Sequence, residues 1–183
     1  MRFRCVSRLT IISLLVLGSS FSVRPQGRTD NSKNDPQPGS PLAEVRDKRR
    51  ALLLVFKSGV LDASDNERAI IDQVLKADPV PKGRNQWVYG TLATKLNSYI
   101  RKYKSLTPAH ELSDADYVIY FNLIEYRRIL NTVYPYGELF VIVKGSPEVQ
   151  KPPRVIWRAR KILWAGDAIS ELIKELKSIR GES

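Results

Sequence analysis

The stretch that decides the fold runs from Tyr117 to Tyr126 and reads YVIYFNLIEY. Branched and aromatic side chains dominate it, and these side chains pack well on the pleated surface of a strand. Two further strand-like segments follow at residues 139–143 and 154–163. The connections between the three segments are too short for helical crossovers, so we expect an antiparallel meander.

A fourth strand is expected earlier in the chain, where residues 51–56 read ALLLVF. A continuous apolar run of this length is typical of a strand that is covered on both faces or lies in the middle of a sheet. Ser64 and Glu67 then have the spacing of a capping box, which predicts the start of a helix. That helix must end near Ala77, because Pro79 follows it.

Two more helices are indicated by apolar residues at steps of three and four. One spans about residues 86–104, and the last is capped by Asp167 and ends before Gly181. A short helix is also expected where Ser40 precedes Pro41. The order of the main elements is therefore β-α-α-β-β-β-α. Because each helix has a single apolar stripe, we predict an α+β fold: a two-layer sandwich of about four mainly antiparallel strands, with the helices on one face.

The first residues have the pattern of a cleavable secretory signal peptide. Three arginines precede an uncharged apolar run at residues 9–17, and small residues follow it. Cleavage after Ser20 or after Ser22 fits the preference for small residues, and the second site fits slightly better. The alternatives are an uncleaved membrane anchor and a buried core helix, but the run is shorter than the roughly 20 apolar residues that span a bilayer.

The chain thus divides into three parts. Residues 1–22 are the predicted signal peptide, residues 23–41 are a Pro-rich leader that we expect to be disordered, and residues 42–181 form a single α+β domain. The formal net charge of the whole chain is +11, and loss of the three arginines of the signal peptide lowers it to +8. The only cysteine, Cys5, is lost as well, which leaves the mature chain without a thiol for a disulfide, for catalysis or for zinc.

Three short segments resemble a known group of proteins. They read ADYVI at residues 115–119, GELFV at residues 137–141 and RVIWR at residues 154–158, and an amphipathic helix follows. Together they resemble small exported or lipoprotein domains of unknown function from the bacterial cell envelope. The resemblance implies an α+β layer in the periplasm or outer envelope and brings no catalytic residues. The chain departs from the lipoprotein members because no lipid-accepting cysteine follows its apolar run.

Residues with catalytic or ligand chemistry are few and isolated. His110 is the single histidine and has no nucleophile or second metal ligand at a known spacing, so we interpret it as a surface loop residue. Asp114 and Asp116 precede a strand, where this pair is typical of a capped turn. No Gly-rich phosphate loop is present, and we expect neither a cofactor nor a metal.

Two carboxylates have the residue type needed for a glycoside hydrolysis pair. Glu125 and Glu138 lie on or beside adjacent predicted strands. Cross-strand pairing with Arg158 or Arg160 is the simpler interpretation of both residues.

Basic residues interleaved with aromatic residues are the strongest surface signal. One interpretation is a solvated face with Trp157 in the core. A second is a binding face for an anionic envelope partner, such as lipid headgroups, lipopolysaccharide or acidic wall polymers. A third is a nucleic-acid interface, which the predicted export disfavours. The candidate residues for an anionic partner are Arg127, Arg128, Lys144, Arg154, Arg158, Arg160 and Lys161.

We therefore expect an exported protein, periplasmic or extracellular, that acts as a non-catalytic binding module through a basic sheet face carrying Arg158 and Arg160. A small enzyme with an unrecognised site is the alternative, and it would gather several ionisable groups in one pocket. A structural subunit is a further alternative, and it would pair with another chain through an exposed edge strand.

The signal-peptide prediction is tested by the mass of the protein recovered from the exported fraction of expressing cells. Cleavage after Ser22 leaves Val23 as the first residue, whereas cleavage after Ser20 leaves Phe21. A chain that keeps Met1 and sediments with membranes would contradict cleavage and favour the anchor.

Overall fold

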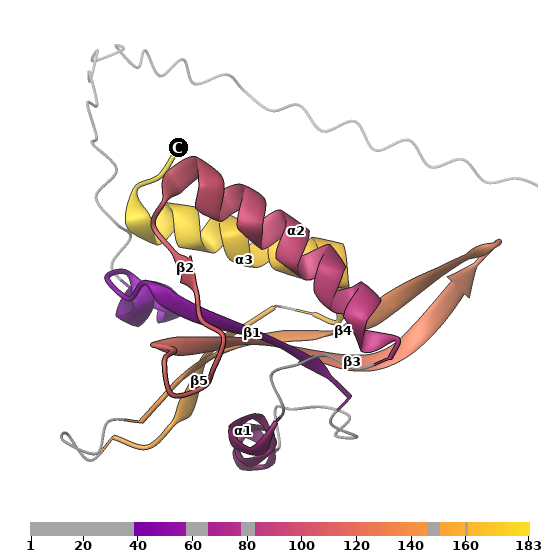
Figure 1. The fold of residues 1–183 in the computed structure, drawn as a ribbon, viewed down its shortest axis with the longest axis horizontal. Helices are drawn as coiled ribbons and strands as arrows, with labels where there is room; N and C mark the ends of the chain where they lie inside the picture. Colours follow the sequence, from indigo (N-terminus) through magenta and orange to yellow (C-terminus); the bar gives the residue numbers. More distant parts are fainter. Residues whose placement is uncertain (1–38, 58–65, 78–82, 146–150, 160) are drawn as a thin grey trace, which may run out of the picture. The chain divides into compact units, whose positions relative to one another are not determined.

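The computed structural model describes residues 39–57, 66–77, 83–145, 151–159 and 161–183, all within one compact unit. Figure 1 shows its sheet between helices. The elements in chain order are a short 3-10 helix η1 (Pro41–Val45), β1 (Arg50–Phe56), α1 (Glu67–Lys76), α2 (Asn85–Tyr103), β2 (Thr107–Pro108), β3 (Tyr117–Ile129), β4 (Thr132–Val143), β5 (Arg154–Arg158), β6 (Leu163–Trp164) and α3 (Ala165–Arg180).

The described strands form one mixed sheet of six strands. Five of them lie in the order β2-β1-β3-β4-β5, and β6 pairs with β4. β1 runs parallel to β2 and β3, whereas β3, β4 and β5 are antiparallel neighbours. The α+β class and the meander are confirmed, but the sheet has six strands where about four are predicted, and it is parallel at β1.

Two features explain the difference. Because α1 and α2 lie between β1 and β3, the chain returns to the sheet in the same direction and the two strands pair in parallel. β2 has only two residues and includes a proline, so alternation in the sequence does not reveal it. The predicted strand at residues 154–163 is divided into β5 and β6. Among the described residues, the last backbone contact before the break is the hydrogen bond that the Ala159 N–H donates to the Leu139 carbonyl at 2.9 Å.

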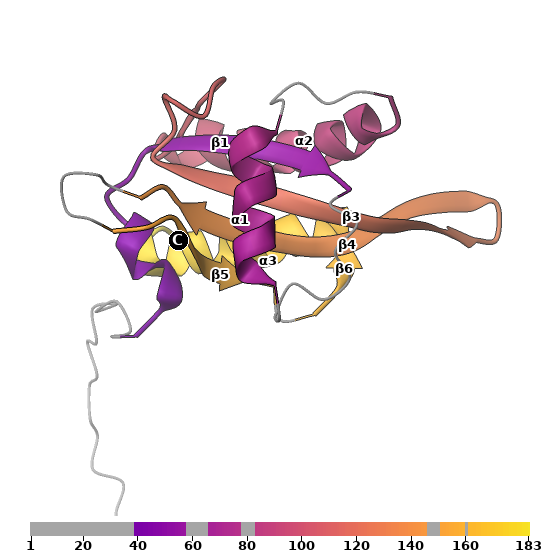
Figure 2. The same ribbon diagram turned by 90° about the horizontal axis from the view of Figure 1, so that it is seen from below.

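Helices cover both faces of the sheet, so the prediction of two layers with all helices on one face is wrong. α2 and α3 pack on one face, and α1 packs on the other (Figures 1 and 2). The reason lies in β1, where alternate residues enter the two cores. Leu53 and Val55 pack under α2 and α3, and Leu52 and Leu54 pack against the core of α1. The apolar run at residues 51–56 thus indicated two covered faces.

Helix ends follow the sequence signals in part. Ser40 caps η1 by accepting from the Leu42 N–H, and Gly181 ends α3 at a positive φ of 65°, as predicted. Ser64 lies outside the described residues. Glu67 is not the third residue of a capping box, because α1 begins with it, and its carboxylate accepts from the Val155 N–H at 2.8 Å.

Two details of the last predicted strand and helix also differ. Asp167 lies in the first turn of α3, and Trp164 is the N-cap residue, so the predicted Asp167 cap is wrong. Ile156 and Trp157 are both buried, because the register shifts between Val141 and Ile142 and interrupts strict alternation in β5.

The hairpin of β3 and β4 extends beyond the rest of the sheet (Figures 1 and 2). The pairing of β1 with β3 ends where Phe56 lies opposite Asn122, and β6 reaches only Tyr136 on the other side. We call residues 124–136 the arm. A register shift between Leu123 and Glu125 marks the base of the arm, as expected for a bulge that bends a strand.

One side chain ties three separate backbone segments together. The Arg180 guanidinium, at the end of α3, donates to the carbonyl oxygens of Ser105 (2.7 Å), Val45 (3.0 Å) and Lys48 (2.7 Å). The Ser105 carbonyl follows α2, the Val45 carbonyl belongs to the last residue of η1, and the Lys48 carbonyl precedes β1. A charged donor satisfies all three, so Arg180 connects α3 to both segments.

Replacing Arg180 tests this connection. Arg180→Met retains an apolar stem but removes every donor, and we expect a loss of about 2–3 kcal/mol, because hydrogen bonds to charged groups exceed neutral ones in strength. For a domain of this size, thermal denaturation should show a melting temperature lower by roughly 5–10 °C. Lys174→Met, on the exposed face of α3, is the control and should have little effect. Equal melting temperatures for both variants would refute the connection.

Candidate functional site

The structure describes six of the seven basic residues that are predicted to face an anionic partner, and these six have different surroundings. Lys144 donates to the carbonyl oxygens of Leu112 (2.5 Å) and Ser113 (2.8 Å), and Arg154 pairs with Glu44. These contacts hold loops and η1 to the sheet. Lys144 and Arg154 therefore have structural partners.

The remaining candidates lie nearer the arm or on exposed positions. Arg127 and Arg128 belong to the arm itself. Arg158, opposite Phe140 in the sheet, and Lys161, just before β6, are exposed and have no ion-pair partner among the described residues. Arg160 lies outside the described residues. The six described residues thus do not all gather on one sheet face.

An aromatic cluster supports the arm on one side. The Trp164 ring lies 5.4 Å from that of Tyr134 and 4.8 Å from that of Tyr136, measured between centroids. The Arg127 guanidinium lies 3.8 Å from the centroid of Tyr136 and donates to Glu125 at 2.5 Å. A two-stranded ribbon alone is only marginally stable in water. These contacts therefore give the arm support that its backbone pairing alone does not provide.

The tip of the arm exposes apolar side chains. Leu130 is 91% exposed, and its neighbour Ile129 is 48% exposed. Leu130 also has a φ of 55°, in the left-handed region that glycine tolerates far better. This leucine therefore adds neither burial nor a favourable turn conformation to the folded protein.

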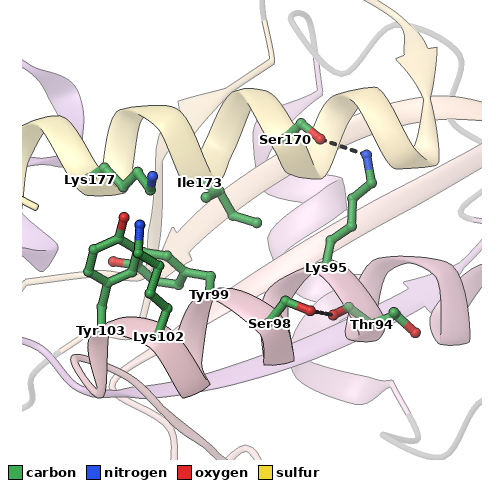
Figure 3. A pocket seen from close by; sticks show the side chains of 9 residues that line it. All are labelled: Thr94, Lys95, Ser98, Tyr99, Lys102, Tyr103, Ser170, Ile173 and Lys177. Carbon is green, nitrogen blue, oxygen red and sulfur yellow. Dashed lines mark hydrogen bonds between the residues drawn. The ribbon is translucent and has the colours of Figure 1, made fainter. Parts of the chain in front are cut away.

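A groove of about 380 Å³ lies between α2 and α3, on the side of these helices shown in Figure 3. Lys95 spans it, because its Nζ donates to the Gly166 carbonyl and to the Ser170 hydroxyl, both at 2.8 Å. The groove is lined by Thr94, Lys95, Ser98, Tyr99, Lys102, Tyr103, Ser170, Ile173 and Lys177. Three of these nine residues are lysines, and none has a carboxylate.

Two lysines of the groove converge on one ring. The Nζ atoms of Lys102 and Lys177 lie 4.7 and 4.9 Å from the centroid of Tyr103. Hydrogen bonding of Lys102 and Lys177 to the Tyr103 side chain, together with their positive charges, lowers the pKa of Tyr103 below its ordinary value of 10.0. Tyr99 behaves in the opposite way, because burial and a hydrogen bond to the Glu182 carboxylate raise its pKa to about 12.

The residues considered for catalysis have structural surroundings. Asp116 accepts from the N–H groups of Arg49 (3.0 Å) and Arg50 (2.8 Å), so it caps the start of β1. Asp114 pairs with Arg50 at 3.5 Å. Both aspartates therefore hold the start of β1 beside the turn that precedes β3, and the interpretation as a capped turn stays a prediction. His110 is exposed between β2 and β3.

Glu125 has another partner than expected, whereas pairing of Glu138 with Arg160 stays a prediction because Arg160 lies outside the described residues. Glu125 pairs with Arg127 on its own strand instead of Arg158. Glu138 accepts from the buried Asn122 side chain at 3.3 Å. Among the described residues, no group of three or more histidine, cysteine, aspartate or glutamate side chains is arranged to hold a metal ion.

Sequence reasoning missed both the arm tip and the groove. The tip had a weak signal: Ile129 and Leu130 are apolar residues within an otherwise polar connection. The groove had none, because its two walls come from helices that are distant in the sequence. Within the described ranges, no helix is both long and apolar enough to cross a bilayer.

The convergence of the lysines on Tyr103 predicts a titration. Lys102→Gln combined with Lys177→Gln should raise the pKa of Tyr103 toward 10.0, because the cations that favour the tyrosinate are removed. A pH titration of the tyrosine ring-carbon signals by NMR measures this change. Lys174→Gln removes an α3 charge outside the groove and should leave Tyr103 unchanged. If both proteins titrate alike, the described convergence is wrong.

Comparisons with protein-family models, curated proteins and solved structures found no match to this chain. The resemblance to small exported envelope domains therefore stays a prediction.

Proposed function

We propose that this protein is an exported, non-catalytic binding module of the cell envelope, and that its arm docks on an anionic lipid surface. Leu130 carries the proposal. A leucine that is 91% exposed at a φ of 55° has an unfavourable side-chain environment and an unfavourable backbone conformation in the free protein. Features that cost stability in this way are typical of functional sites, where a partner supplies the compensation.

The chemistry around the tip favours a lipid surface as that partner. Ile129 and Leu130 offer apolar side chains for insertion, and Arg127 and Arg128 precede them on the strand. Because consecutive strand residues point to opposite faces, the two arginines flank the ribbon on both sides. Apolar side chains enter the bilayer interface while basic side chains contact anionic headgroups.

The aromatic cluster fits the same orientation. Tyrosine and tryptophan favour the boundary between headgroups and water, because their rings are apolar and their edges are polar. Tyr134, Tyr136 and Trp164 lie along the arm behind the tip. The predicted export and the charge of +8 for the mature chain support an anionic surface in the envelope.

Two alternatives make different predictions for the arm. A structural subunit would use the edges of the arm, where β3 and β4 pair only with each other beyond Asn122 and Tyr136. An enzyme would use the groove between α2 and α3, which gathers lysines and tyrosines. Neither alternative requires an apolar side chain at the tip.

Leu130→Gly is the decisive variant. Glycine adopts the observed φ freely, so we expect thermal stability to stay the same or to rise by up to about 1 kcal/mol. Co-sedimentation with vesicles of phosphatidylcholine and phosphatidylglycerol should weaken roughly tenfold, because insertion of one leucine side chain is lost. The measurement uses the protein recovered from the exported fraction of expressing cells.

Matched controls separate the tip from general surface properties. Leu75→Gln removes another exposed leucine, on α1, and should leave vesicle binding unchanged. Arg128→Gln should weaken binding several-fold at low salt, whereas Arg101→Gln on α2 should not. Unchanged binding of Leu130→Gly, or equal binding to vesicles of phosphatidylcholine alone, would reject the proposed surface.

A further inference from the structure

The groove between α2 and α3 has a cationic end. Figure 3 shows the side chains of Lys102 and Lys177 reaching Tyr103 from opposite helices. Neither lysine has an ion-pair partner among the described residues, and none of the nine lining residues has a carboxylate. Because both ammonium groups lie beside the same ring, their charges repel each other, and an anion that contacts both would offset this repulsion. The packing of α2 on α3 therefore brings two ammonium groups to one ring, and the Glu182 carboxylate beside Tyr99 offsets only part of their charge.

Hydroxyl oxygens line the other part of the groove. Thr94 donates its proton to the Gly90 carbonyl (2.7 Å), and Ser98 donates to the Thr94 carbonyl (2.9 Å). Ser170 likewise donates to the Gly166 carbonyl at 2.8 Å. Because these protons are committed to the helices, the hydroxyl oxygens present acceptor lone pairs to the groove. A ligand there must bring hydroxyl donors of its own.

We infer that this groove binds a phosphorylated polyol of the glycerol phosphate type. The phosphate would lie between Lys102 and Lys177, and the ligand hydroxyls would donate to the oxygens of Thr94 and Ser98. The apolar Ile173 faces the carbon chain between the two ends. A volume of about 380 Å³ is in the range of small-molecule sites.

A phosphate suits the cationic end better than a carboxylate. A phosphate monoester has three terminal oxygens and close to two negative charges at neutral pH, so it accepts from both ammonium groups at once. Lysine binds phosphate as a point charge and needs no planar geometry. Lys95 is already held by the Gly166 carbonyl and Ser170, but it retains one N–H and adds a positive charge along the groove.

A carboxylate of the protein limits the positive potential. The Tyr99 hydroxyl donates to the Glu182 carboxylate at 2.5 Å, and the Tyr103 hydroxyl donates to the Ser183 carbonyl at 2.9 Å. Glu182 thus places a negative charge beside the cationic end. Its removal should strengthen the binding of an anion, whereas a purely structural role of the lysines predicts no such gain.

Calorimetric titration with glycerol 3-phosphate tests the inference on the exported full-length product. Lys102→Gln combined with Lys177→Gln should weaken binding about tenfold or more, and Glu182→Gln should strengthen it several-fold. Lys174→Gln, outside the groove, is the matched control and should bind as the parent does. Circular dichroism of each variant confirms that the fold is intact.

The hydroxyl end is tested by comparing three probes. Glycerol 3-phosphate should bind more tightly than inorganic phosphate, and glycerol alone should bind weakest. Ser98→Ala should reduce the preference for glycerol 3-phosphate over inorganic phosphate. On binding, the pKa of Tyr103 should rise, because a bound anion offsets the effect of the two lysines. Absence of binding at low salt, or equal loss in Lys102→Gln/Lys177→Gln and in Lys174→Gln, would overturn the inference.

The phosphorylated polyol can be free or part of a lipid headgroup. Vesicles that contain phosphatidylglycerol separate these sources when the Leu130→Gly variant is used, because its arm no longer inserts. Competition between such vesicles and glycerol 3-phosphate supports a headgroup, and its absence supports a free ligand. Leu130→Gly should bind glycerol 3-phosphate as the parent does, so failure of the lipid-docking proposal and failure of the groove proposal are distinguishable.

Discussion

The parallel pairing of β1 with β3 constrains the rest of the structure. It requires a crossover between the two strands, and this crossover contains α1 and α2 on opposite faces of the sheet. It also fixes where the sheet stops, because β1 ends opposite Asn122 and β3 continues to Ile129. The extra length of β3 and its partner β4 becomes the arm. The same crossover brings α2 beside α3, and the groove forms between them.

The sequence predicts the elements better than their arrangement. Strands and helices leave local patterns, so residues 51–56, the meander and the end of α3 at Gly181 are predicted correctly. The second helical layer was foreseeable from ALLLVF alone, since a strand without polar residues needs cover on both faces. The length of the arm was not foreseeable, because Tyr126 near its base packs against the core but its tip residues are exposed and follow no apolar alternation. Gly137 at its base is explained only by the fold: a Cβ there would lie 2.1 Å from the Asn122 carbonyl oxygen.

Charge in the sequence does not reveal which basic residues are available to a partner. Lys144, Arg154 and Arg180 resemble the other cations in composition, yet each is held by carbonyl or carboxylate oxygens from distant parts of the chain. Lys102 and Lys177 give no sequence signal as a pair, because only helix packing brings them together. A basic patch predicted from spacing therefore mixes structural residues with residues that are free to bind.

The arm tip and the groove share one physical property. In the free protein, the residues present at each place are less favourable in free energy than a simple replacement would be. Glycine at position 130 would relieve the backbone, and glutamine at position 102 or 177 would relieve the repulsion between ammonium groups. Some helix ends follow local preference, as the Ser40 cap and the Gly181 end do. Lys104 has a positive φ of 54° as well, but it ends α2 there and its N–H donates to the Ile100 carbonyl at 2.8 Å. Departures from local preference that bring no gain inside the fold indicate interactions outside it. The two departures also differ in chemistry, since one is apolar and the other cationic, and this difference is the reason to treat them as two separate binding surfaces.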